Sequence, residues 1–180
     1  MRLWTLIIAA LLLPGTAAAV CPSTVPILGS LTCSSTQSGN LNIGAPSRLG
    51  NSYTCGSPYA PLAQDGPEDV YEFNCQTTGS VNLDITNLSC DIDIYILNST
   101  CNPNSGCHAG STAASTTNDS VTFTCQAGQT YYVVIEGYEV PFGNCFSGAS
   151  YTLTFDVSQS TGCPEDCNDG IDNDFDGDID

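Results

Sequence analysis

The sequence predicts an all-β protein: an antiparallel β-sandwich, rich in disulfides, that ends in a short irregular acidic segment. Short stretches of alternating, β-branched or aromatic residues recur between clusters of Gly, Pro, Asn and Ser. No stretch beyond the first 19 residues shows a convincing helical period. The chain also holds eleven cysteines in 180 residues, a density typical of exported domains that are stapled by disulfides.

Residues 1–19 are predicted to be a secretory signal peptide. Arg2 supplies the charged start, residues 6–13 form an apolar run, and Ala17 to Ala19 give an A-x-A cleavage signal. The apolar run is too short to cross a bilayer, and no later segment is long enough. We therefore expect a secreted, extracellular or cell-surface protein without a membrane span.

The cysteines indicate a disulfide framework formed in an oxidising compartment. Their spacing is irregular and the chain has one histidine, so zinc binding is a weaker explanation. The odd count has two explanations: one free thiol, or a partner beyond Asp180. We favour the second, because the calcium motif described below is also incomplete. The cysteines are Cys21, Cys33, Cys55, Cys75, Cys90, Cys101, Cys107, Cys125, Cys145, Cys163 and Cys167.

Residues 20–57 are rich in Ser, Thr, Gly and Pro and contain short apolar pieces. This pattern predicts an irregular, disulfide-tied N-terminal section with one or two edge strands.

The predicted sandwich spans residues 58–157. In residues 91–97, Ile92, Ile94 and Ile96 share one face of a strand, which is the alternation expected of a half-buried strand. Several short strands separated by turn signals favour a sandwich. The expected strands are 69–75, 80–88, 91–97, 120–125, 130–137 and 150–157.

The charge balance excludes partners that carry many negative charges. Without the signal peptide, Arg48 is the only basic residue against nineteen carboxylates. Nucleic acid and anionic membranes would be repelled. Eight of those carboxylates lie in residues 163–180, which follow a predicted linker at residues 158–162.

The acidic tail predicts a calcium-binding loop that stops before its last ligand. Calcium needs six to eight oxygen ligands, which alternate carboxylates supply when a glycine permits a sharp turn. With Asp172 at the first position of the loop, Gly177 takes the sixth position and Ile179 the eighth. A solvated acidic tail without a specific metal is the alternative. The predicted Ca²⁺ ligands are Asp172, Asp174, Asp176, Asp180 and the carbonyl of Asp178.

Four segments together resemble the bacterial pre-peptidase C-terminal domain, over roughly residues 58–157. They are EDVYEF at 68–73, DIDIYIL at 91–97, AGQTYYVVIEGY at 127–138 and YTLTF at 151–155. The resemblance implies a jelly-roll-like β-sandwich attached to secreted enzymes, often peptidases. Its implied roles are secretion, targeting or the binding of polymeric substrates, without catalysis of its own.

The tail at residues 163–180 resembles the Cys- and Asp-rich repeats of exported bacterial proteins. It is also similar to the calcium loops of thrombospondin type 3 repeats and dockerins. In the thrombospondin family the next residue is commonly a cysteine, which would make the cysteine count even.

Other candidate site residues have both a functional and a structural interpretation. Asp91 and Asp93, with Asp69, could form a second cation site or an acid–base pair, but such residues also cap strands and turns. His108 is expected to lie exposed in a Gly/Ser-rich loop. The chain has no H-E-x-x-H or G-x-S-x-G motif and no second histidine, so we predict no enzymatic activity.

An aromatic cluster near the predicted 137–148 loop has the same ambiguity. It could present a platform for sugar or peptide, although such residues more often divide between core and strand surface. The cluster is Tyr131, Tyr132, Tyr138, Phe142 and Phe146.

The function we predict is that of a secreted, non-catalytic binding or surface-structural module with a calcium-stabilised tail. Its partner would be calcium together with an extracellular polysaccharide or protein. Two alternatives remain. The chain could be an accessory or targeting region of a larger exported hydrolase, or a structural subunit of an extracellular assembly.

Overall fold

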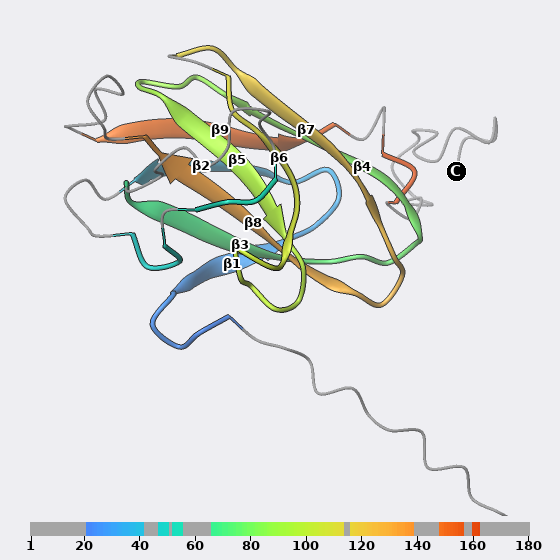
Figure 1. The fold of residues 1–180 in the computed structure, drawn as a ribbon. Coiled ribbons are helices and arrows are strands. Elements are labelled where there is room, and N and C mark those ends of the chain that lie inside the picture. The colour runs from blue at the N-terminus through green and yellow to red at the C-terminus, as the bar shows by residue number, and fades with distance from the viewer. Residues whose placement is uncertain are drawn as a thin grey trace, which may run out of the picture.

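The computed structural model describes residues 21–41, 47–50, 52–55, 66–113, 116–138, 148–156 and 160–162, and these residues form a disulfide-bonded β-sandwich (Figure 1). The all-β prediction is confirmed, and no helix occurs within these ranges. The strands are β1 (Ile27–Leu31), β2 (Thr36–Leu41), β3 (Glu68–Asn74), β4 (Gly79–Thr86), β5 (Ile92–Leu97), β6 (Cys107–Ser111), β7 (Asp119–Cys125), β8 (Thr130–Gly137) and β9 (Ala149–Phe155).

Two sheets form the layers of the sandwich. Sheet A has the order β1-β3-β8-β5-β6, and sheet B has the order β2-β9-β4-β7. From β2 to β9 the chain changes sheet at every connection except the one between β5 and β6. Strands β2 to β9 therefore follow the eight-stranded order of a jelly roll.

Strand β1 is the exception to antiparallel pairing. It runs parallel to β3, with Leu31 opposite Phe73, while the other described strand pairs are antiparallel. Parallel neighbours need a crossover between them, and here the chain passes through β2 in the other sheet before it returns as β3. Strands β1 and β2 are thus the outer strands of the two sheets on one side of the sandwich.

The six strands expected within 58–157 are present, each within two residues of its predicted limits. Strand β6 was not predicted from the sequence. The prediction that His108 lies in a loop is wrong, because Cys107–Ser111 pairs with β5 as an edge strand of sheet A. Its sequence, CHAGS, has no β-branched residue, so tertiary pairing and not local propensity makes it a strand.

The main core lies between the sheets and takes alternate residues from each strand. In β9, for example, Tyr151, Leu153 and Phe155 are buried, whereas the residues between them lie on the outer face. The ring of Phe73 from sheet A meets the rings of Phe123 and Phe155 from sheet B, with centroids 6.3 and 5.3 Å away. Apolar burial of this kind is the dominant favourable term in folding.

A second apolar cluster lies on the outer face of sheet A and is covered by the N-terminal section. Val25 and Tyr53 pack there against Val70, Tyr95 and Val134. Disulfides Cys21–Cys101 and Cys55–Cys107 fasten this cover to the connection between β5 and β6 and to β6 itself. Residues 21–25, 47–50 and 52–55 of the N-terminal section therefore form a covering layer over part of this sheet face.

The disulfide framework also ties β3 to β7. Cys75, just after β3, is bonded to Cys125 at the end of β7. Cys33 and Cys90 are disulfide-bonded as well. Cys145, Cys163 and Cys167 lie outside the described residues.

Part of the segment predicted as a linker is attached to β4. Ser160 is fully buried, and its hydroxyl accepts a hydrogen bond from the backbone N–H of Asn82 at 2.9 Å. The N–H of Gly162 donates to the carbonyl of Ser80 at 2.8 Å. These contacts hold residues 160–162 beside β4, directly before the acidic tail.

Two predicted segments, the signal peptide at 1–19 and the tail at 163–180, lie outside the described residues. Among the residues that are described, no helix is long and apolar enough to cross a membrane.

Candidate functional site

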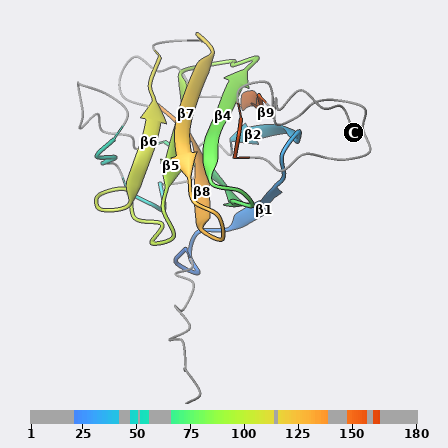
Figure 2. The ribbon, with the colours of Figure 1, turned by 90° about the vertical axis from the view of Figure 1, so that its right-hand side faces the viewer.

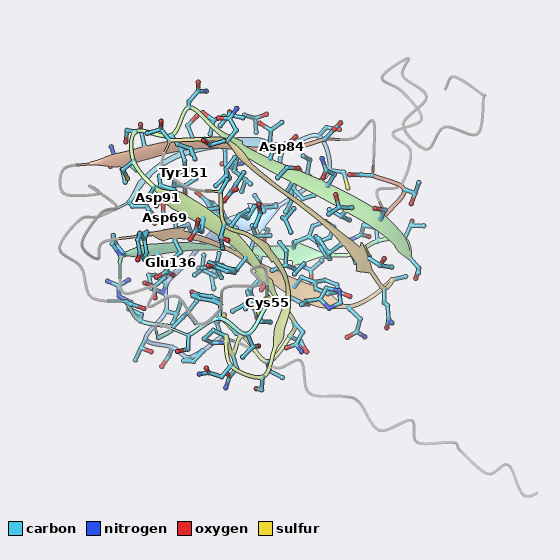
Figure 3. All side chains as sticks on the ribbon, turned by 45° about the horizontal axis from the view of Figure 1, so that its top comes forward. Cys55, Asp69, Asp84, Asp91, Glu136 and Tyr151 are labelled. Atoms are coloured by element: carbon cyan, nitrogen blue, oxygen red, sulfur yellow. A yellow bond between two sulfur atoms is a disulfide. The ribbon has the colours of Figure 1, made fainter. Side chains whose placement is uncertain are left out.

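Six carboxylates gather at one end of the sandwich, which we call the acidic end. Strands β3, β5 and β7 begin at this end, and β8 finishes there. Figure 3 shows three of the six, Asp69, Asp91 and Glu136, toward this end together with Tyr151. The acidic end consists of Glu68, Asp69, Asp91, Asp93, Asp119 and Glu136.

Three of these carboxylates form a row across the outer face of sheet A. Glu136 on β8 is opposite Glu68 on β3 and opposite Asp93 on β5. Residues that pair directly across strands point to the same face of a sheet, so the three side chains are neighbours. Glu136 is fully buried and Asp93 is 4% exposed. Like charges in such a row repel one another unless they are neutralised or hydrogen-bonded.

Two stacked tyrosines from different parts of the chain contact this row. The rings of Tyr53 and Tyr95 are 3.9 Å apart and nearly parallel. The Tyr53 hydroxyl donates to Glu136 at 2.7 Å, and the Tyr95 hydroxyl donates to Asp93 at 3.4 Å. Burial, followed by the charge of Glu136, raises the pKa of Tyr53, while burial followed by the charge of Asp93 raises the pKa of Tyr95. Both phenols therefore stay neutral and act as donors.

Backbone groups of the covering layer hold Glu68. One carboxylate oxygen of Glu68 accepts hydrogen bonds from the N–H groups of Arg48 and Leu49, the latter at 2.7 Å. Burial raises the pKa of Glu68, and the two backbone hydrogen bonds oppose that shift. The other oxygen is buried without a hydrogen-bond partner among the described residues.

Asp69 points the other way, into the space between the sheets. The Tyr151 hydroxyl on β9 donates to Asp69 at 2.6 Å, and the Tyr71 hydroxyl lies 2.8 Å from that of Tyr151. A phenol has one proton, so Tyr71 must donate to Tyr151 in this arrangement. Burial raises the pKa of Asp69, and the bond from Tyr151 partly offsets this effect.

Asp119 begins β7 and is 1% exposed. One of its oxygens accepts hydrogen bonds from the Ser111 hydroxyl at 2.9 Å and from the Ala113 N–H at 2.7 Å. Burial is the main cause that raises the pKa of Asp119, and the nearby charge of Asp91 adds to it. Asp119 therefore fastens the end of β6 and the following turn to sheet B.

The structure does not bring Asp69 and Asp93 together as a cation or acid–base site. Asp69 lies on the inner face of sheet A with Tyr71, whereas Asp93 lies on the outer face with Tyr95. Among the described residues, no group of three His, Cys, Asp or Glu side chains is placed to hold a metal ion. The hydrogen bonds of Asp69 and Asp93 agree with their structural interpretation.

His108 is exposed on β6 and fastens the two sheets along one side. Its Nε2 lies 3.0 Å from the carbonyl oxygen of Thr124 on β7. Its ring packs edge-on against Phe123, with centroids 5.8 Å apart, and lies 5.5 Å from the ring of Tyr131. These contacts give His108 a structural role.

The three described residues of the predicted aromatic platform divide as the structural interpretation expected. Tyr131 and Tyr132 are 5% and 1% exposed, and they belong to the inner and outer apolar clusters respectively. Tyr138 is partly exposed. Phe142 and Phe146 lie outside the described residues, as do the predicted calcium ligands Asp172, Asp174, Asp176, Asp178 and Asp180.

Sequence reasoning missed several residues of the acidic end: Glu68, Asp119, Glu136 and their partners Tyr53 and Tyr151. One usable signal was present. Glu136 is the only charged residue in the run 130–137, where a buried strand would otherwise be apolar or aromatic. A buried carboxylate needs donors, so its presence pointed to nearby hydroxyl or N–H groups.

Comparisons with known proteins concern the same part of the chain. The family model of the bacterial pre-peptidase C-terminal domain matches residues 67–137, a range that contains all six carboxylates of the acidic end. A search of the curated proteins found no match. Among solved structures, the chain is similar to the pre-peptidase C-terminal domain of a collagenase from Bacillus anthracis. The identity is 14% and the TM-score 0.47, over 72% of this chain and 96% of that one.

Proposed function

We propose that this protein is a secreted, non-catalytic module that binds extracellular material. The observation that carries the proposal is the hydrogen bonding of the carboxylates at the acidic end. Its carboxylates accept hydrogen bonds from backbone N–H groups and from neutral hydroxyls, as Glu68 and Asp69 do. Groups held in this way position strands and loops.

Catalysis at the acidic end would need a different arrangement of its side chains. General acid–base catalysis needs a group that can reach a substrate proton, and nucleophilic catalysis needs a nucleophile beside a base. The inner carboxylate Asp69 instead faces the core, and the outer row is covered by Tyr53 and the segment that carries it. The name of the matching family, a domain found beside peptidases, supports an accessory role.

Export is supported by the disulfides. Cys21–Cys101, Cys55–Cys107 and Cys75–Cys125 close loops of 80, 52 and 50 residues. Such bonds form and persist outside the reducing cytosol.

A second candidate is an accessory or targeting region of a larger exported hydrolase, favoured by the match to a pre-peptidase C-terminal domain. In that case the protein would increase the activity of a hydrolase on an insoluble polymer and not on a soluble one. Equal activity on both would count against it.

Binding and catalysis can be separated in one experiment. The disulfide-bonded protein is mixed with insoluble collagen, cellulose, chitin and β-1,3-glucan. The bound fraction and the released peptides or sugars are then measured. Retention on at least one polymer without product supports the proposal. Product that accumulates in proportion to protein concentration, or a lack of retention on every polymer, contradicts it.

We further propose that calcium orders the acidic tail. The support is the spacing of Asp172, Asp174 and Asp176 before Gly177. Attachment of Gly162 to β4 gives the adjoining chain a fixed starting point.

Isothermal titration with calcium tests this second proposal. We expect the intact protein to bind Ca²⁺ weakly, with a Kd of roughly 10⁻⁴ to 10⁻³ M. The variant Asp174→Ala/Asp176→Ala should lose the heat of binding. A control variant, Asp84→Ala on the outer face of sheet B, should keep it. Identical titrations of all three proteins would contradict the calcium proposal.

A further inference from the structure

The outer face of sheet B consists almost entirely of hydroxyl and amide side chains. In each strand of this sheet, alternate residues such as Leu83 and Leu153 enter the core, so the residues between them point outward. We call this outward surface the hydroxyl face. Figure 2 looks toward two of its strands, β4 and β7. Representative members are Thr36, Ser38, Ser120, Thr124, Thr152 and Thr154.

The strand register places these groups in rows. Thr36 on β2 is opposite Thr154 on β9, which is opposite Asp84 on β4. Adjacent strands lie about 4.8 Å apart, and residues on one face of a strand repeat about every 6.8 Å. The face is therefore a two-dimensional array of hydrogen-bonding groups with a fixed spacing.

Hydrogen bonds within the face hold part of this array in place. The Asn82 side-chain carbonyl accepts from the Thr122 hydroxyl at 2.7 Å and from the Ser120 hydroxyl at 3.3 Å. The Asn87 amide donates to the Thr152 hydroxyl at 3.3 Å. The two bonds to Asn82 fix the orientations of the Ser120 and Thr122 hydroxyls, which lowers the entropy that a partner must overcome on binding.

The charge of this face differs from that of the whole chain. The chain has a net charge of −17, yet the strands of sheet B place one carboxylate, Asp84, on this face. A second, Asp156, follows β9 and accepts a hydrogen bond from the Asn82 amide at 3.4 Å. An anionic partner would be repelled by the rest of the molecule, and a cationic partner would be attracted to the carboxylates elsewhere. A surface of hydroxyl and amide donors and acceptors with few charges is complementary to an uncharged partner of the same kind.

The two sheets also differ in what covers their outer faces. Tyr53 and Val25 of the covering layer pack on sheet A. On sheet B, Ser38, Thr122 and Thr124 are exposed. A ligand could therefore reach sheet B without displacing a described segment that packs on its outer face.

We propose that the hydroxyl face binds a neutral polysaccharide. This inference rests on the proposed binding function. It adds which surface of the protein binds and which class of partner is bound. The outward positions of these four strands hold no aromatic residue, so hydrogen bonds and not ring stacking must supply the affinity. Each contact is then weak, and binding becomes firm where a polymer offers many equivalent groups at once.

The test uses the full disulfide-bonded protein and two double variants with the same added charge. Ser38→Asp/Thr124→Asp places carboxylates on two strands of the hydroxyl face, at side chains whose hydroxyls have no hydrogen bond among those described. Thr116→Asp/Thr117→Asp places them in the exposed loop before β7. Binding isotherms are measured on insoluble cellulose, chitin and β-1,3-glucan, with insoluble collagen as a protein polymer, and thermal unfolding confirms that each variant is folded.

We expect retention of the unmodified protein on at least one of the three polysaccharides. The variant on the hydroxyl face should bind about tenfold more weakly or worse, because buried carboxylates must lose water. The loop variant should bind as the unmodified protein does. Retention should also be insensitive to added NaCl, since screening affects charged contacts.

Three results would overturn the inference. Equal binding by both variants would show that the surface is wrong while leaving the binding function intact. Binding to collagen alone would refute the polysaccharide partner and still support a binding module. Retention on none of the four polymers would refute the proposed function and the inference together.

Discussion

At the scale of single residues, the most informative feature is the pairing of buried carboxylates with tyrosines. The Tyr151 hydroxyl donates to Asp69 on the inner face of sheet A, and the Tyr53 hydroxyl donates to Glu136 on the outer face. The protein has almost no basic side chains, so neutral phenols and backbone N–H groups supply the donors that buried carboxylates require. The tyrosines therefore act both as apolar packing and as hydrogen-bond donors.

Tyr151→Phe should destabilise the protein by about 1–3 kcal/mol, because the half-buried Asp69 carboxylate loses its phenol donor. Tyr71→Phe is the matched control, since it removes a phenol oxygen from the same chain of hydroxyls but leaves the bond to Asp69 intact. We expect it to cost less, about 0.5–1.5 kcal/mol. Urea unfolding monitored by fluorescence gives both values. Equal losses of stability in the two variants would mean that the hydrogen bond to Asp69 contributes no more than the one between the two tyrosines.

At the scale of elements, β2 and β9 show how a glycine permits close packing across a strand pair. Gly39 on β2 is directly opposite Tyr151 on β9. A Cβ atom at residue 39 would lie 2.2 Å from the tyrosine ring. The Tyr151 ring lies over Gly39, and its hydroxyl reaches Asp69. Both the pairing of β2 with β9 and the Tyr151–Asp69 hydrogen bond therefore depend on the absence of a side chain at residue 39.

Gly39→Ala should lower the free energy of unfolding by about 1–3 kcal/mol, because the ring must move or the strands must separate. Gly29→Ala on β1 provides the control, since a Cβ atom there meets nothing within 4 Å. The control should be neutral or stabilising by about 0.4–1 kcal/mol through the unfolded state. Denaturant midpoints measure both. A neutral Gly39→Ala would contradict the close approach of the Tyr151 ring.

At the scale of the whole molecule, the charge distribution determines how stability depends on pH. Burial raises the pKa values of Glu68, Asp69 and Asp119 in the folded protein. A raised pKa means that the folded state binds more protons than the unfolded state between the ordinary and the raised value. These groups therefore stabilise the fold at low pH, and that contribution is lost as pH rises through the raised values. Repulsion within a chain of net charge −17 acts in the same direction.

We predict that the free energy of unfolding increases as the pH falls from 7 toward the ordinary carboxyl values of 3.8 to 4.5. The increase should level off below that range. In 1 M NaCl the Debye length is about 3 Å, so repulsion between surface charges is screened. Only the part of the pH dependence that is due to the buried carboxylates should then remain. Asp69→Asn keeps an acceptor for Tyr151 and should flatten the dependence. Stability that falls steadily with acid would contradict the prediction.

Six of the seven strands between residues 58 and 157 could be located from the sequence, and β6 could not. Alternation in stretches such as Ile92, Ile94 and Ile96 identifies a strand and its inner face, because side chains on a strand alternate with a period of two. The expectation that this strand is half-buried is wrong, because β5 is buried on both faces: Tyr95 and Leu97 lie under the covering layer on the outer side. The cysteine content indicated disulfide bonding, and the resemblance of residues 58–157 to a known domain implied the jelly roll.

Which strands pair with one another depends on contacts between residues that are far apart in the chain. Strand β6 exists because β5 pairs with it, and β1 lies parallel to β3 because the chain crosses the other sheet between them. The acidic end depends on the register that places Glu136 between Glu68 and Asp93. Pairing and register join residues that are far apart in the chain, and they are chosen by the burial of whole faces. A local pattern shows which side chains of a strand point into the core. The packed fold decides which strands lie beside that strand and in which register.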